Sequence, residues 1–599
     1  MAIEYKYPRV NISTLAKTRS VRIPERADTT VLFQPIYAKR GPVNKIVRLF
    51  AVDELLTTYG EPDFATQGQG ILNAINWLKN GGTVYATRLT QPGITTAVAD
   101  GETLITAKYP GTFYNDIELE FTWNYSSTSL KAYSFTLKID DYETFKAQTL
   151  KELIIRVNDS SDYISIDPSF DISSDILSGV NKTKKYTLKN AIDGVDGLSE
   201  FTPEIINNNA NYIKFSNGIY IYRHANTGED KDTNPFVYDI QAPDGSLIND
   251  VSAKNLPSLI RDRSTNLTSE QLQQLEQCAA YIINNPETNI IEYAMCPKTN
   301  DELVRDLFGT LDAEKSAIET LGPISQLLGN KLETPIDVIL DAGYSEDTKT
   351  IISLYTKNVD QTLELSRKDI ICIFDEYVND YTTKYTGKRP TICDISSCIN
   401  KCDNRAVYTQ YFLVDDDYAK NIWVTPSYFL AKLIPHNDIT YGIQWPTAGL
   451  TRGVLTDVKD INENPTPSIK NANFIDRINY VERDSNGYKF MSQRTFDGSE
   501  ETEYTALSFL NNSRALAKMV KELEKVGREY LFEFNDATTL ANMRAALNRY
   551  MSNWVSNRTL NFAEVDVAAS EYSDEAVDVT LNVRFTGTIE VISIDIIIE

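Results

Sequence analysis

Histidine and cysteine are scarce in this sequence, and their scarcity argues against several kinds of chemistry. Only two histidines, His224 and His436, occur in 599 residues, which disfavours histidine-based catalysis and metal binding. The six cysteines are too few for the disulfide framework of a small secreted scaffold and fit a reducing compartment. Cys393, Cys398 and Cys402 form a cluster, but a closed zinc site needs four ligands and no histidine lies nearby in the sequence. We interpret these three as reduced structural thiols and predict that the protein holds no metal.

Long apolar runs and net positive charge are also lacking. No run of 18 apolar residues occurs, and the opening residues MAIEYKYPRV lack the apolar centre of a signal peptide. We therefore expect no membrane insertion and no obvious secretory route. The formal net charge is −24, so the surface as a whole should repel nucleic acid. Hydrophobic residues make up 42% and charged residues 24% of the chain, as is typical of a soluble protein of several domains.

Catalytic signatures are missing as well. Gly68-Gln69-Gly70 partly mimics a dinucleotide-binding loop, but no strand precedes it. The sequence contains no P-loop, no nucleophile elbow and no HExxH motif. Its carboxylates are too abundant for one acid–base pair to stand out. We expect no catalytic residues and no cofactor, with a multidomain α/β enzyme of unrecognised active site as the alternative.

The charge that is present is unevenly distributed. Residues 1–50 hold ten Lys/Arg against three acids, a net of +7, so the other 549 residues carry 49 − 80 = −31. This basic segment is interpreted as an arm that docks on another copy, as a solvated tail or as an RNA-binding arm. The last is disfavoured because no aromatic or Arg/Gly-rich interleaving accompanies the charge. Its basic residues up to position 28 are Lys6, Arg9, Lys17, Arg19, Arg22 and Arg26.

Hydrophobic periodicity predicts an α/β (α+β) multidomain chain. Strands at 30–38 and 83–90 flank helices at 52–59 and 70–80, and alternating residues predict an antiparallel hairpin over 117–125 and 133–139. Short buried strands at 336–340, 370–374 and 411–414 alternate with helical stretches, and two helices follow at about 505–530 and 536–556. The predicted division is an extended arm 1–28, a first core segment 29–95, an inserted β-rich domain 96–195, a second inserted α/β domain 196–330, a central α/β domain 331–470 and a C-terminal domain 471–599.

Two strands are predicted to close the chain. Val577, Val579, Leu581, Val583 and Phe585 alternate with polar residues, and Gly587 marks a turn before TIEVISIDIIIE at 588–599. This last strand contains neither proline nor lysine and is apolar on both faces, so a free edge there would be an aggregation template. It must pair, either within its own domain or with a sheet of another subunit by strand addition. The residues predicted to form the link are Ile589, Val591, Ile592, Ile594, Ile596 and Ile598.

A basic stripe marks the first of the two C-terminal helices. Five cations recur at spacings of 4, 3, 4 and 3, which places them on one helix face: Arg514, Lys518, Lys521, Lys525 and Arg528. An apolar stripe on another face supplies the packing surface. The basic face is interpreted either as a solvated surface or as a docking ridge.

Short elements in a fixed order give the sequence a family resemblance. They are Gly41-Pro42, Val52–Leu55, Tyr59–Pro62, Gly82–Tyr85, YPGTFYND at 109–116, WPTAG at 445–449, GYKFMSQRTF at 487–496 and YLFE at 530–533. Together they resemble the contractile tail sheath proteins of myophages and related injection machines. Thr447 and Ser492 stand where that family usually has proline and glycine, and the region of about 130–330 matches little.

The resemblance implies a structural role without an active site. Sheath subunits form a helical cylinder of stacked rings around a tail tube, and contraction converts a metastable state into a shorter, wider one. Extended termini are exchanged between subunits, so residues 1–28 and 588–599 would link neighbours, with the strand 577–585 as acceptor. The Arg514–Arg528 stripe would attach to the tube. Implied partners are the tube, baseplate and tail-terminator or neck proteins, in a virion assembled in the host cytoplasm. The large insertions favour a phage over a bacteriocin-type or other injection system.

Overall fold

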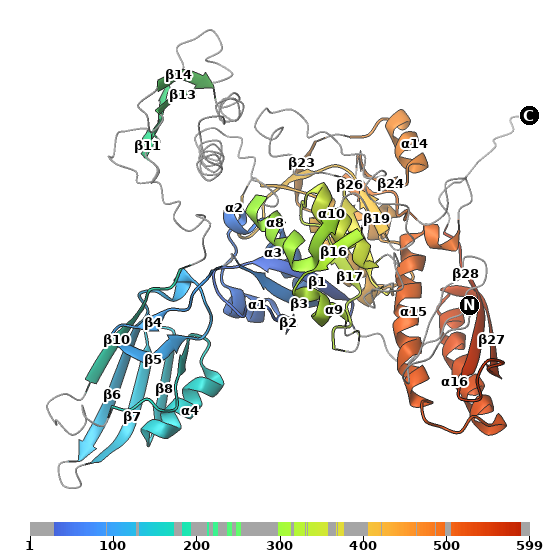
Figure 1. Cartoon of the computed structure of the whole chain (residues 1–599). Helices are drawn as coiled ribbons and strands as arrows, with labels where there is room; N and C mark the ends of the chain where they lie inside the picture. Colours follow the sequence, from blue (N-terminus) through green and yellow to red (C-terminus); the bar gives the residue numbers. More distant parts are fainter. Residues whose placement is uncertain are drawn as a thin grey trace, which may run out of the picture.

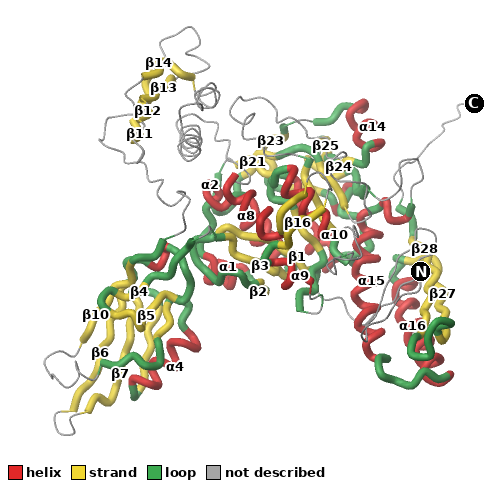
Figure 2. The backbone as a smooth tube through the Cα atoms, in the orientation of Figure 1, coloured by secondary structure: helices red, strands yellow, loops and turns green. Residues whose placement is uncertain are grey.

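A computed structural model describes most of the chain (Figures 1 and 2). The described residues are 29–90, 93–126, 131–172, 183–192, 298–312, 317–329, 331, 333–356, 367, 369–376, 405–420, 422–462, 464–485, 487–496 and 505–588, with four strands between 212 and 252. The arm at 1–28, the linking-strand residues 589–599 and the cysteine cluster at 393–402 lie outside them. The predictions on those segments stay predictions.

A seven-stranded sheet forms the centre of the molecule. Its strand order is β2-β3-β1-β17-β18-β19-β24, and every neighbouring pair is parallel except β2–β3. β1 pairs with β17 across some 300 residues of sequence, at Leu32 opposite Val338, so the two predicted core segments build one domain. The strands are Val31–Tyr37 (β1), Ile46–Leu49 (β2), Thr83–Leu89 (β3), Val338–Leu340 (β17), Ile371–Asp375 (β18), Arg405–Tyr408 (β19) and Ile478–Asn479 (β24).

Helices cover both faces of this sheet, which explains why its inner strands are almost entirely buried. One face packs against α1 (Val52–Tyr59), α3 (Gln69–Lys79) and α12 (Pro426–Thr440). The other face packs against α8 (Lys298–Phe308), α9 (Ile324–Gly329) and α10 (Glu346–Thr356). The bounds of α1 coincide with the predicted helix 52–59. The short helix α2 spans Phe64–Gln67.

The structure moves two of the predicted domain boundaries. Val304, Phe308 and Leu328 belong to the core of the central domain, so residues 298–329 are part of that domain rather than of the second insertion. The central domain also extends past residue 470, because β24 joins its sheet and Phe490 lies in its core. Its smaller elements are β15 (Gly309–Asp312), β16 (Ala317–Leu321), β20 (Phe412–Val414), β21 (Ile422–Val424), α13 (Gly449–Arg452), β22 (Val454–Leu455), β23 (Val458–Ile461), α14 (Pro467–Ile475), β25 (Val481–Asp484) and β26 (Gly487–Phe490).

The first insertion is an antiparallel β domain with its own core, projecting from the central domain at the lower left of Figure 1. Its strands have the order β8-β7-β6-β10-β4-β5-β9, and the predicted hairpin is β6–β7. Leu119, Phe121 and Leu137 are fully buried there. The elements are β4 (Val98–Ala99), β5 (Glu102–Ala107), β6 (Glu118–Ser126), β7 (Lys131–Ile139), β8 (Glu143–Ala147), α4 (Leu150–Ser160), β9 (Ile164–Ile166) and β10 (Thr183–Lys189). A separate four-stranded sheet holds β11 (Tyr212–Lys214), β12 (Tyr220–Ala225), β13 (Phe236–Gln241) and β14 (Leu247–Ser252).

The last unit of the described chain runs from residue 505 to residue 588 and is called the C-terminal unit below. It contains α15 (Leu510–Glu529), α16 (Ala537–Ser556), β27 (Leu560–Ala569) and β28 (Val577–Phe585). Its core lies between the helices and the hairpin, at Met519, Leu547, Trp554 and Leu581. The prediction of a multidomain α/β fold is confirmed.

Candidate functional site

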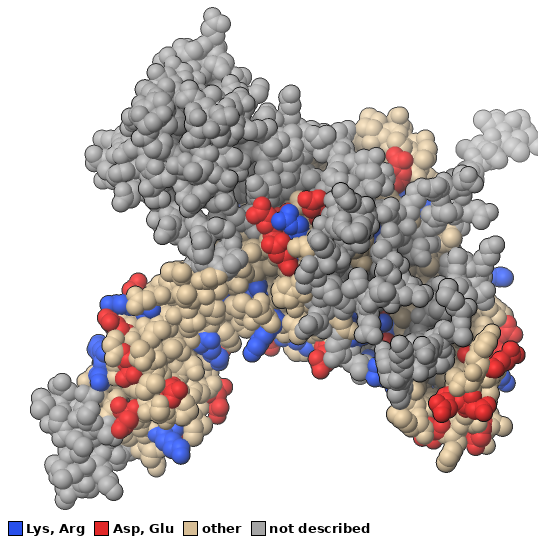
Figure 3. All heavy atoms as spheres, in the orientation of Figure 1, with Lys and Arg blue, Asp and Glu red and all other residues tan. Residues whose placement is uncertain are grey.

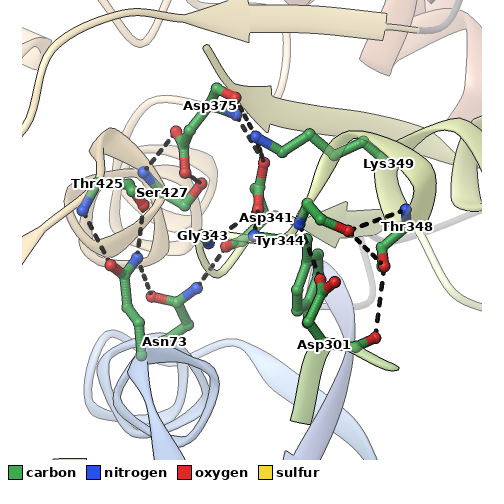
Figure 4. A network of polar contacts seen from close by, with 12 residues as sticks. Asn73, Asp301, Asp341, Gly343, Tyr344, Thr348, Lys349, Asp375, Thr425 and Ser427 are labelled. Carbon is green, nitrogen blue, oxygen red and sulfur yellow. Dashed lines mark hydrogen bonds and ion pairs between the residues drawn. The ribbon is translucent and has the colours of Figure 1, made fainter. Parts of the chain in front are cut away.

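The carboxyl edge of the central sheet is where a doubly wound α/β protein normally binds a ligand. Asp341 follows β17 and Asp375 ends β18, and both side chains are 0% exposed. Lys349 of α10 places its Nζ 3.0 Å from Asp341 Oδ2. The backbone N–H of Asp375 donates to the same oxygen at 2.9 Å. The charges therefore meet inside the protein (Figure 4).

Polar side chains from α3 and α12 occupy the space beside these carboxylates. Ser427 donates its hydroxyl and its backbone N–H to Asp375. Gln69 bonds both the N–H and the hydroxyl of Thr425, at 2.9 and 2.8 Å, and Asn73 donates to the Asp341 carbonyl at 2.8 Å. The network in Figure 4 thus joins α3, the ends of β17 and β18, and the start of α12. Its polar groups bond to one another inside the protein, as in a structural hydrogen-bond network. In the described part of the chain, no group of three or more His, Cys, Asp or Glu is placed to hold a metal.

Burial, with the Asp341 carboxylate beside it, raises the pKa of Asp375 to about 7. A raised carboxyl pKa means that the folded state binds the proton more tightly than the unfolded state. The stability that the protonated Asp375 contributes is therefore complete below pH 4, and it is lost as the pH rises from about 4 to about 7. We expect Asp375→Asn, which mimics the protonated acid, to lose less stability than the wild type over that interval. The difference should reach a few kcal/mol.

Denaturant titration of both proteins at pH 4.5, 6 and 7.5 measures this difference. Asp301→Asn is a useful comparison, because burial also raises the pKa of Asp301, whose carboxylate accepts from Ser345 N–H at the edge of the same network. Parallel stability curves for the wild type and Asp375→Asn would show that Asp375 is ionised throughout.

The predicted basic ridge on α15 is only partly exposed. Arg514 is 4% exposed and pairs with Asp438 at the end of α12. Lys521 lies 2.7 Å from Asp337 Oδ1 and 3.7 Å from Asp369 Oδ2. The expectation that all five cations form one outward surface needs correction: two of them face carboxylates of the central domain.

The Lys521 contact belongs to a buried ion cluster at the amino edge of the sheet. Arg367 donates to both oxygens of Asp369, at 2.8 and 3.0 Å. Burial alone raises the pKa of Asp369, but the Arg367 guanidinium and the Lys521 ammonium outweigh burial and hold it at about 2. Asp337 also accepts the Val31 N–H at 2.8 Å. Helix α15 is thereby fastened to the starts of β1, β17 and β18.

The remaining cations of the stripe differ in position and exposure. Lys518, in the middle of α15, is half-buried, whereas Lys525 and Arg528, in the last turns of the helix, are exposed. Arg528 makes an i,i+4 contact with Glu524 at 3.4 Å, the local ion pairing common on solvated helix faces. Any surface that the stripe offers to a partner is thus confined to its last turns.

The strand predicted over 577–585 exists as β28, and it pairs with a strand that the sequence prediction missed. The role of β28 as an acceptor stays a prediction. β27 and β28 form an antiparallel two-stranded sheet with Leu560 opposite Phe585 and Ala569 opposite Val577. Among the described residues, neither outer edge of this pair meets another strand. Leu581 and Phe585 are buried against the helices, while Asp578 and Thr580 point to solvent. The signal for β27 was present in Ala563, Val565 and Val567, which alternate with Glu564 and Asp566.

Comparisons with known proteins place this fold. No protein-family model matches the chain, and no curated protein matches it in sequence. The structure is similar to the sheath tail protein Lin1278 from Listeria innocua, with a TM-score of 0.52 and 11% identity over 95% of this chain and 94% of that one. A sheath tail protein from Desulfitobacterium hafniense gives a TM-score of 0.46 and 10% identity over 96% of this chain and 100% of that one. The PVC sheath in its contracted state, from an extracellular contractile injection system, gives a TM-score of 0.36 and 17% identity over 46% of this chain and 75% of that one. The chain thus has the fold of a tail sheath protein.

Proposed function

We propose that this chain is the subunit of a contractile sheath, which polymerises helically around a tail tube and contracts to drive that tube through a host envelope. The observation that carries the proposal is the whole-length likeness of fold to a sheath tail protein. Among the described residues, no further strand pairs with the edges of the β27–β28 sheet, and this supports the proposal because such edges offer a place where other copies can attach.

Strand addition is the proposed link between subunits. The arm at 1–28 of one copy and the strand at 588–599 of another would extend the β27–β28 sheet of a third. A ten-residue added strand makes roughly five backbone hydrogen bonds worth about 1 kcal/mol each, so one link contributes several kcal/mol. Such links can persist while the contacts between globular domains break and re-form during a two-state rearrangement.

The proposed partners are further copies of the chain in stacked rings, the tube, the baseplate and the tail-terminator or neck proteins. The proposed location is a phage virion, with assembly in the host cytoplasm. A bacteriocin-type or other injection system is the alternative within the same mechanism. We propose no enzymatic activity: at the carboxyl edge of the central sheet, Asp341 and Asp375 are fully buried and, among the described residues, bond to groups of the protein itself.

Electron microscopy of the purified chain, alone and with tube protein, tests the proposal. We expect hollow tubes of regular helical symmetry. A soluble monomer that forms no polymer even on added tube protein would overturn the sheath proposal and favour the multidomain enzyme.

The proposed tube contact narrows to the exposed end of the α15 stripe. We expect the double variant Lys525→Glu/Arg528→Glu to decorate tubes at least about tenfold more weakly at low salt, because each reversal turns an attraction into a repulsion. The difference should shrink at high salt, since both side chains are exposed and their charges are screened. The variant's thermal unfolding should stay close to that of the wild type, since both side chains are exposed.

Co-sedimentation with preformed tubes measures decoration. The matched control is Lys151→Glu/Arg156→Glu, which makes the same charge change on exposed positions of α4 in the first insertion. Equal decoration by the wild type and by Lys525→Glu/Arg528→Glu would leave the stripe as a solvated helix face.

A further inference from the structure

One end of the C-terminal unit carries exposed aromatic rings among carboxylates. The loop between α15 and α16 meets the turn between β27 and β28, since Asn535 Nδ2 donates to the Asp574 carbonyl at 2.8 Å. Phe532 and Phe534 are 89% and 83% exposed, and Tyr572 is 83% exposed. We call this surface the acidic tip and define it as Phe532, Phe534, Glu571, Tyr572, Asp574 and Glu575. Acidic side chains gather over this part of the molecule at the lower right of Figure 3.

The single chain gives no reason for this arrangement. Phe532 has a φ of 68°, in the left-handed region that a bulky side chain rarely adopts, yet its ring gains no burial there. Three large aromatic side chains at one end of a unit mark an interaction surface more often than chance exposure. What covers them must tolerate or neutralise the surrounding carboxylates.

Where α16 ends, at the opposite end of the C-terminal unit, the adjoining part of the central domain carries exposed apolar residues beside arginines. The Arg452 guanidinium lies 4.8 Å from the centre of the Trp445 ring, and that of Arg558 lies 5.7 Å from it. Gln444 joins this region to the C-terminal unit by donating to the Asn557 carbonyl at 3.3 Å. Around it, Leu450 is 69% and Ile439 60% exposed. We call this surface the arginine patch and define it as Ile439, Tyr441, Trp445, Leu450, Arg452 and Arg558.

Helix α16 sets the separation of the two surfaces. Its first residue follows the acidic tip and its last precedes Arg558, and its 20 residues span about 30 Å. Between residues 537 and 563 the sequence contains three arginines and no acid. The two surfaces therefore differ in character: the acidic tip is negative with exposed aromatic rings, whereas the arginine patch, formed by Arg558 and residues 439–452 of the central domain, is positive with exposed apolar groups.

We propose that the acidic tip of one copy docks on the arginine patch of the next copy. The inference rests on the proposed sheath function and adds a contact that does not use the terminal strands. Carboxylates would pair with Arg452 and Arg558, and the tip aromatics would pack against Leu450, Tyr441 and the Trp445 region. Because two different surfaces of one chain meet, the contact is heterologous, so it continues from copy to copy into a ring or an open helical filament instead of closing a dimer.

Charge reversal in the full-length chain tests the contact. The tip variant is Glu571→Lys/Glu575→Lys, the patch variant is Leu450→Asp/Arg558→Glu, and the swap variant combines all four changes. All four side chains are exposed, so folding should be preserved. We expect the tip and patch variants each to raise the critical concentration for polymerisation by about tenfold. The swap variant, whose surfaces are complementary again, should return to within about threefold of the wild type.

The control is Glu118→Lys/Asp159→Lys, which repeats the charge change of the tip variant on exposed positions of the first insertion. An unchanged critical concentration in both reversed variants, or no recovery in the swap variant, would overturn the docking proposal while leaving the sheath standing. A wild type that never polymerises but forms oligomers lost in both reversed variants would keep the contact and reject the sheath. A wild type that is monomeric in sedimentation at its highest soluble concentration would reject both.

Discussion

Replacing residues 588–599 by a Gly/Ser segment of equal length is expected to abolish the helical polymers formed by the full chain. Eight of the twelve residues in the replaced segment are β-branched. The sheet that would receive it, β27–β28, has two strands and no further partner among the described residues. Two-stranded sheets are marginal on their own. Loss of the donated strand removes several kcal/mol from every link along the polymer, and because links repeat with each subunit the loss compounds.

Negative-stain electron microscopy and sedimentation across a concentration series measure the effect. The control is Ile155→Ser, which also keeps the chain length and also replaces a β-branched residue. Ile155 lies on α4 of the first insertion and is 53% exposed in the wild type. Polymers that persist after replacement of 588–599 would keep the sheath but move its linkage to the arm at 1–28 or to the contacts between globular units. Circular dichroism should show the C-terminal unit intact, because its core residues lie within β27, β28 and the two helices.

The charge reversal Lys521→Glu is expected to separate α15 from the central domain. The substitution removes the cation between Asp337 and Asp369 and places a third carboxylate beside them. In the wild type, Asp369 is 2% exposed, and Arg367 and Lys521 together hold its pKa at about 2. The substitution leaves Arg367 as the nearest cation and sets a repulsion against it, so the buried Asp369 carboxylate becomes more costly to keep ionised in the folded state. Breaking one partner out of a buried ion cluster costs about 3–5 kcal/mol.

Denaturant titration, with limited proteolysis to detect an opened joint between the units, measures this cost. Lys525→Glu lies one turn further on an exposed position of the same helix and should change the free energy of unfolding by about 0.5 kcal/mol or less. Lys521→Met, which removes the charge without adding a carboxylate, should fall between the two. If Lys521→Glu were no more destabilising than Lys525→Glu, the ion cluster would not be what fastens α15.

This result matters for the function, because Lys521 belongs to the stripe that the sequence analysis assigned to the tube. Reversing Lys518, Lys521 and Lys525 together would weaken tube decoration by loosening the subunit, whether or not the stripe touches a tube. The pair Lys525 and Arg528 avoids this confusion, since neither side chain is buried against the central domain.

Local patterns in the sequence were sufficient for most elements. The helix at 52–59, the strands at 83–89 and 577–585 and the two C-terminal helices have the predicted type, and their bounds are close to those predicted. Apolar spacing and turn residues act over a few neighbours, so the sequence alone carries that information. The missed strand β27 follows the same rule. Ala563, Val565 and Val567 alternate with acids, but alanine contributes little hydrophobic contrast, and Ala568 and Ala569 end the alternation.

Pairings between distant segments could not be obtained in this way. Nothing local in Val31–Tyr37 indicates that it lies beside Val338–Leu340, or that residues 298–329 return to the same domain after the insertions. The same limit applies to the basic stripe, because a helical repeat of cations has the same appearance whether it faces water or carboxylates. The sequence by itself determined the elements, the overall charge and the family resemblance. Only the tertiary structure decided that Asp438, Asp337 and Asp369 meet α15, since the partner of a charge depends on which segments the fold brings together.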